Sequence, residues 1–185
     1  KMFSPVRPVL SSAQNNRDHR KITVIDGHTA FTGGINLADE YINRKVRFGH
    51  WKDTAIMLKG DAVQSFTMLF LEMWAVNQME PADCQNYLTP KHVVPDPPHG
   101  YVIPYGDHPY DNENVGEEVY FHILNHSKKY VHIMTPYLIL DSEMITTLTR
   151  AAKSGIEVII IMPHIPDKWY AFVLAHTYYK ELIQA

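Results

Sequence analysis

The 185-residue sequence has one cysteine, Cys84, no hydrophobic run long enough to cross a bilayer, and no excess of positive charge. One thiol cannot form an intramolecular disulfide, and its presence fits a reducing compartment. The apolar runs fall short of the ~18 residues typical of a transmembrane helix, and no signal-peptide pattern is recognisable. The formal net charge of −3 lacks the basic footprint of a nucleic-acid-binding protein. We therefore expect no nucleic-acid partner.

One segment near the N-terminus combines residue types that suit chemistry on an anionic substrate. From His19 to Asn36 it is H-R-K-I-T-V-I-D-G-H-T-A-F-T-G-G-I-N. Its β-branched run, residues 22–25, predicts a buried strand. Since residues two apart on a strand share a face, His19 and Lys21 should project together. There the imidazole can attack phosphorus, and the ammonium can neutralise charge on phosphoryl oxygens.

The rest of this segment predicts a hairpin that ends in a phosphate-binding loop. Asp26-Gly27 indicates a turn, and residues 30–32 a returning strand. Gly33 and Gly34 would let the backbone approach a ligand closely, and the Asn36 amide can donate to a phosphate oxygen. A lone His-x-Lys is usually a solvated surface pair, and Asp-Gly is usually just a turn. Six positions at fixed spacing favour a functional site instead.

These residues resemble the phospholipase D superfamily, whose H-x-K-x4-D signature is intact, and more narrowly the bacterial cardiolipin synthases. The narrower resemblance is carried by N-N-R-D-H-R-K, F-T-G-G, D-E-Y, W-K-D-T and T-P-Y followed by an aspartate, at residues 15–21, 31–34, 39–41, 51–54 and 135–141. The resemblance extends over most of the chain and is weakest at residues 81–114. Ile35 departs from the pattern, because a serine is commoner at that position.

The resemblance implies a phosphatidyltransferase that joins two phosphatidylglycerol molecules into cardiolipin and releases glycerol through a phosphohistidine. His19 would be the nucleophile or the general acid, with Lys21 stabilising charge on phosphorus. Asp26 belongs to the motif, although its distance along the strand suggests that it braces the local fold. Glu117, at the start of a predicted helix, would be an orienting carboxylate for the histidine of the other repeat. No metal or cofactor is implied.

The resemblance also implies that a second motif is needed. Family members carry two such motifs whose histidines meet in one active site, and no second H-x-K-x4-D occurs before Ala185. We expect an internal fragment with an α/β fold, a phospholipase D-like mixed sheet flanked by helices. Residues 1–80 would form the back half of repeat one, residues 81–113 a proline-rich linker, and residues 114–185 the front half of repeat two. Such a piece should be inactive without the missing repeat or a second copy.

Further elements are expected from periodicity and from capping residues. Strands are predicted at residues 51–58, 101–103, 130–134 and 156–162, and helices from residue 61 and at 115–128, 142–153 and 167–182. Asp141 should cap the third of these helices. The apolar face of the first helix should comprise Phe66, Leu69, Phe70, Met73 and Asn77. The strand–helix–strand order at residues 130–162 predicts a parallel crossover.

Three other functions remain open from the sequence. A hydrolytic phospholipase D shares every motif residue, a single-motif nuclease could dimerise, and a non-catalytic fragment could simply bind lipid. For a cardiolipin synthase the partners would be phosphatidylglycerol and a membrane lipid surface. The resemblance places the whole protein at the bacterial cell membrane, with anchoring helices outside this segment and the catalytic part on the cytoplasmic side.

Overall fold

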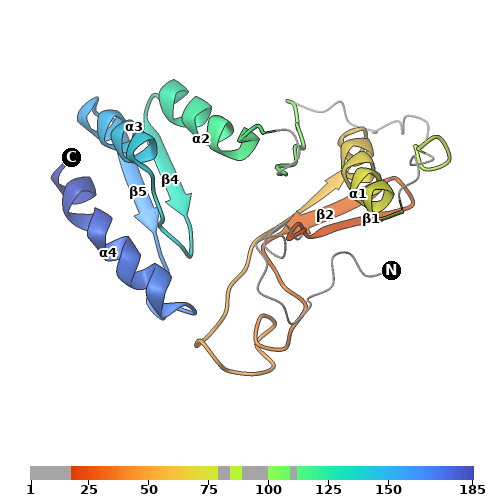
Figure 1. Cartoon of the computed structure of the whole chain (residues 1–185), viewed down its shortest axis with the longest axis horizontal. Helices are drawn as coiled ribbons and strands as arrows, with labels where there is room; N and C mark the ends of the chain where they lie inside the picture. The colour runs from red at the N-terminus through yellow and green to blue at the C-terminus, as the bar shows by residue number, and fades with distance from the viewer. Residues whose placement is uncertain (1–17, 79–83, 89–99, 109–111) are drawn as a thin grey trace. The chain divides into compact units, whose positions relative to one another are not determined.

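A computed structural model describes residues 18–78, 84–88, 100–108 and 112–185. Five strands and four helices lie within these residues, and the chain divides into two units (Figure 1). The first unit comprises Lys1–Lys45 and Trp51–Glu113, and the second comprises Val46–His50 and Asn114–Ala185. The α/β class is confirmed, but each unit has its own small sheet. The assignment of the units to two repeats stays a prediction.

An antiparallel hairpin and one further strand form the sheet of the first unit. Its strands are β1 (Ile22–Ile25), β2 (Thr29–Gly33) and β3 (Ala55–Lys59), in the order β1-β2-β3. Val24, Ala30 and Leu58 lie in one row across the three strands, and their side chains reach the core beneath α1 (Ala62–Gln78). Strand β3 begins at Ala55, later than the predicted residue 51.

The turn between β1 and β2 has the geometry that its sequence predicts. Asp26 and Gly27 both have positive φ, at 54° and 61°, and the His28 amide donates to the Ile25 carbonyl at 3.0 Å. Paired positive φ values characterise the type I′ turn, whose twist matches that of the flanking strands. The Asp-Gly step therefore fixes the register of the hairpin that carries the motif.

The buried face of α1 differs from the predicted one. The side chains that are buried are Val63, Phe66, Thr67 and Leu71. Phe70 and Trp74 stack on each other outside the core, with 49% and 38% of their surfaces exposed. The predicted face was wrong at Phe70, because the helix is apolar nearly all round and periodicity cannot select one side. The side chain of Asn77 lies outside the described residues.

The second unit contains a parallel strand pair connected by a helix. In chain order its elements are α2 (Val115–His126), β4 (Tyr130–Met134), α3 (Ser142–Lys153), β5 (Glu157–Ile161) and α4 (Trp169–Gln184). Strands β4 and β5 pair in parallel, as the strand–helix–strand pattern predicts. Leu124, Val131 and Leu148 form the buried centre of this unit.

Local hydrogen bonds explain where the elements of the second unit begin and end. Asp141 caps α3 as predicted, because its Oδ1 accepts from the Met144 amide at 2.7 Å. Helix α4 begins two residues later than predicted, since Asp167 accepts a hydrogen bond from the Tyr137 hydroxyl instead. Helix α2 ends at His126, where the backbone of Ser127 becomes extended.

The predicted linker is described only in part. Residues 81–83, 89–99 and 109–111 lie outside the described residues, and residues 101–108 carry no strand pairing where a short strand was expected. Among the helices that the structure describes, each is too short or too polar to cross a membrane.

Candidate active site

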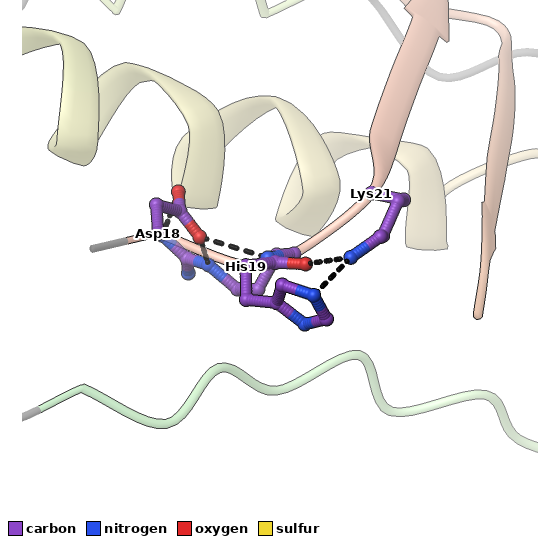
Figure 2. Close-up of polar contacts among 4 residues, drawn as sticks. Asp18, His19 and Lys21 are labelled. Carbon is purple, nitrogen blue, oxygen red and sulfur yellow. Dashed lines mark hydrogen bonds and ion pairs between the residues drawn. The ribbon is translucent and has the colours of Figure 1, made fainter. Parts of the chain in front are cut away.

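The side chains of His19 and Lys21 meet immediately before β1. Lys21 Nζ lies 2.9 Å from His19 Nε2 and donates to the His19 carbonyl oxygen at 2.6 Å (Figure 2). The predicted juxtaposition of the two side chains is therefore present. An ammonium group has donors and no acceptor, so Nε2 must accept and the proton of the neutral ring must be on Nδ1. The Nε2 lone pair points at the cation that would hold phosphoryl oxygens.

The charge on Lys21 depends on its surroundings. Burial lowers the pKa of Lys21, whereas the carboxylates of Asp53 and Asp18 act in the opposite direction, Asp53 more strongly. His19 is exposed and Lys21 is partly buried. The pair therefore combines an accessible imidazole with an ammonium whose protonation is supported by nearby negative charge.

Asp18 and Arg20 form an ion pair next to the histidine. Arg20 Nε and Nη2 lie 3.0 and 3.1 Å from the two Asp18 oxygens, and the Arg20 amide also donates to Asp18. Burial raises the pKa of Asp18, but these Arg20 contacts outweigh it and hold the pKa below its usual value. A Cβ atom at Gly106 would lie 2.8 Å from both Arg20 Nη1 and Leu69 Cδ2. Arg20 is thus held between Asp18 and the segment that contains Gly106.

Gly33 and Gly34 are required by close packing against the chain that leads into β3. A Cβ atom at Gly33 would lie 2.5 Å from the Thr54 carbonyl oxygen and 2.8 Å from Ala55 Cα. At Gly34 it would lie 2.6 Å from Asp53 Oδ1, and the Gly34 amide donates to the Thr54 carbonyl at 3.2 Å. This amide is already paired within the sheet. Phosphate binding by the two glycines stays a prediction.

Gly33→Ala should lower the free energy of unfolding by about 1–3 kcal/mol, the usual cost of overpacking. The atoms that the new methyl group meets belong to the backbone of Thr54 and Ala55, so they cannot rotate away. Gly34→Ala is the matched comparison, because its methyl group meets the carboxylate of a side chain that can move. Urea denaturation of both variants measures the difference, and equal losses would contradict this packing.

Two further motif residues, Asp26 and Asn36, make no hydrogen bond to His19 among the described residues. Asp26 lies in the exposed turn at the far end of β1, and the four residues of that strand alone span about 13 Å. The bracing role of Asp26 stays a prediction. Asn36 follows β2, and its carbonyl accepts from the Ala38 amide. Phosphate binding by the Asn36 side chain stays a prediction.

Glu117 belongs to the second unit and contacts the residue that caps α3. A hydrogen bond to Asp141 raises the pKa of Glu117, while the Met144 amide and then Glu117 lower the pKa of Asp141. Glu117, Asp141 and Glu143 each place one carboxylate oxygen within 4.8 Å of the other two, which is close enough to hold a cation. A proton shared by Glu117 and Asp141 also accounts for their proximity. The orienting role of Glu117 toward His19 stays a prediction.

The sequence reasoning missed Asp53 as a member of the site. Its carboxylate accepts from the Trp51 indole at 3.1 Å and from the Thr54 amide at 2.9 Å. The W-K-D-T stretch was recognised as part of a family pattern, but no role was assigned to the aspartate. Asp53 lies 32 positions after Lys21 in the sequence. Only the pairing of β2 with β3 brings it next to the end of the hairpin.

Comparison with known proteins gives consistent matches. A family model described as "Cardiolipin synthase, PLD-like domain" matches residues 120–185. The chain is 37% identical to a cardiolipin synthase of Geobacillus kaustophilus over 99% of its length and 36% of that protein, and 39% identical to cardiolipin synthase 2 of Bacillus cereus over the same shares. It is 55% identical to an uncharacterized Streptococcus mutans protein, over all of this chain and 40% of the other. The chain thus spans about two fifths or less of these relatives. No solved structure matches it.

Proposed function

Because the chain belongs to the cardiolipin synthase family of phospholipase D-like proteins, we propose that it contributes one catalytic histidine to a phosphatidyltransferase. The reaction converts two phosphatidylglycerol molecules into cardiolipin and glycerol. The observation that carries this proposal is the 2.9 Å contact between His19 Nε2 and Lys21 Nζ. An imidazole next to a cation supports chemistry on a phosphodiester, with the imidazole as nucleophile or proton donor and the cation compensating charge on the phosphoryl oxygens.

The proposed chemistry proceeds in two displacements at phosphorus. In the first, a histidine Nε2 forms a bond to phosphorus while the bond to the glycerol oxygen breaks, and a second histidine donates the proton to that oxygen. In the second, the hydroxyl of another phosphatidylglycerol gives its proton to the second histidine, and its oxygen bonds to phosphorus as the phosphorus–nitrogen bond breaks and releases the first histidine. His19 fills one of these roles. The other histidine comes from the second repeat of the polypeptide or from a second copy.

Lys21 acts on the oxygens rather than on the nitrogen. An arriving phosphate competes with His19 for the ammonium protons, so Lys21 can turn from Nε2 to a phosphoryl oxygen and leave the lone pair available. Negative charge on those oxygens grows in the transition state, and a fixed cation then contributes most. A histidine nitrogen is the nucleophile in this route, so the route involves no metal-bound water. The substrates place the reaction at a membrane lipid surface, which we propose to be the bacterial cell membrane.

Product analysis tests this proposal. A family-length enzyme that carries this segment should convert phosphatidylglycerol vesicles into cardiolipin and glycerol, with an acid-labile phosphohistidine as intermediate. Phosphatidic acid in place of cardiolipin would indicate a hydrolase, and cleavage of DNA would indicate a nuclease. The absence of any covalent intermediate would indicate a lipid-binding protein. The 185-residue chain alone should form no cardiolipin unless two copies pair and supply two histidines.

A further inference from the structure

We propose that Asp53 is a positioning residue that supplies the counter-charge for Lys21 and keeps its ammonium directed at the phosphate site. This inference rests on the proposed function, because it concerns how the same site is held ready for an anionic substrate. Asp53 is not part of the H-x-K-x4-D signature; it lies two residues before β3.

The position of Asp53 is fixed by the fold. Oδ2 accepts from the Trp51 indole and Oδ1 from the Thr54 amide, so both oxygens are held. Trp51 is in turn fixed, because its backbone amide donates to the Asn43 side chain at 2.7 Å and its carbonyl accepts from the same side chain at 2.8 Å. Asp53 is therefore held by a chain of contacts that does not involve the substrate.

The pairing of the strands brings the backbone next to Asp53 to the same end of the sheet as Lys21. Ile22 pairs with Thr32, so continuing the register by one residue places Lys21 opposite Gly33. Gly33 pairs with Ala55. At the next residue, Gly34, Asp53 Oδ1 lies where a side chain would begin, 2.6 Å from the position of a Cβ atom. Gly34 thus has a second consequence. The missing side chain of Gly34 leaves the space that the Asp53 carboxylate occupies, one residue after the position opposite Lys21.

The two carboxylates near Lys21 differ in how much charge they can offer it. Asp18 is already paired with the Arg20 guanidinium at 3.0 Å, so most of its charge is compensated. Both hydrogen-bond donors of Asp53 in the described part of the chain are uncharged groups, an indole and an amide. Burial lowers the pKa of Lys21, and both carboxylates act against this fall. Consistent with the difference in their charge, Asp53 has the larger opposing effect and Asp18 the smaller.

The consequence for function is a lysine that stays cationic in a partly buried position. A neutral amine would neither attract an anionic headgroup nor stabilise charge on its oxygens. A carboxylate held by the fold at this end of the sheet favours the ammonium form of Lys21 without needing a direct contact.

The experiment measures the Lys21 pKa in the 185-residue chain by 13C NMR of the lysine ε carbons, assigned with Lys21→Arg. Asp53→Asn should shift the Lys21 pKa downward, while Asp53→Glu, which keeps the charge, should largely restore it. Asp18→Asn should give a smaller shift, and Asp61→Asn, at the start of α1, should give none. If Asp53→Asn does not fold, Asp53→Ser provides an uncharged replacement that keeps an oxygen acceptor.

An unchanged Lys21 pKa in a folded, uncharged Asp53 variant would overturn the proposal, as would an equal shift from Asp61→Asn. This readout is independent of enzymatic turnover. Failure to make cardiolipin would count against the proposed function alone, whereas an insensitive Lys21 would count against the role of Asp53 alone. In the active enzyme, Asp53→Asn should additionally move the alkaline limb of the pH–rate profile to lower pH.

Discussion

His19→Ala should abolish cardiolipin formation by a family-length enzyme that carries this segment, with a loss of at least about 10³-fold in kcat/KM. Alanine provides neither a nitrogen to bond to phosphorus nor a proton donor for the leaving glycerol. Both candidate roles of His19 therefore predict the same outcome. The rate is measured from radiolabelled phosphatidylglycerol in mixed micelles, with separation of the lipid products.

His28→Ala is the matched control for this variant. His28 follows the turn at the other end of β1, where its ring Nδ1 contacts the neighbouring Thr29 hydroxyl at 3.0 Å. The control should retain most of the rate and the wild-type melting temperature. Near-normal turnover of His19→Ala would disprove the proposed function, whatever the structure of the site.

Lys21→Ala should lower kcat by about 10²- to 10³-fold with a smaller change in KM, as expected for one donor to a developing oxyanion. The ammonium interacts with phosphoryl charge that is greater in the transition state than in the ground state. Lys21→Arg should recover part of this loss, because it restores the charge with a different geometry. Steady-state kinetics over a range of lipid concentrations separates the two parameters.

Lys59→Ala serves as the control for nonspecific loss of positive charge. Lys59 ends β3 opposite Thr29, at the end of the sheet away from the His19–Lys21 contact. It should leave kcat unchanged. If Lys21→Ala raised KM alone, the lysine would contribute to lipid binding and not to the chemical step.

The sequence predicted the parts of the fold that depend on local pattern. The Asp-Gly turn, the strand from Ile22 and the Asp141 cap each follow from a few neighbouring residues with well-defined preferences. The buried side of α1 was not predictable in this way, because its apolar and polar residues are both spread around the helix and leave periodicity with little contrast. Tyr101–Ile103 has strand-forming residues, yet these residues have no strand partner in the part of the chain that the structure describes.

The candidate site shows the same division between local and distant information. The alternation of side chains along an extended backbone was sufficient to bring His19 and Lys21 together. Asp53 depends on the pairing of strands that are distant in the sequence, which a motif of eight residues cannot contain. The two glycines were expected to approach a ligand, and the structure adds a close approach of Gly33 to Thr54 and Ala55 and of Gly34 to Asp53.

The hydrogen bond from Lys21 to His19 has a consequence for the enzyme between turnovers. A ring nitrogen whose electron pair is engaged by an ammonium is a weaker nucleophile, so we expect the resting ring to react slowly with small electrophiles. Under the proposed function, a ligand with enough negative charge to compete for the lysine would restore the reactivity of the ring. Recognition of an anionic headgroup and activation of the ring would then be one event.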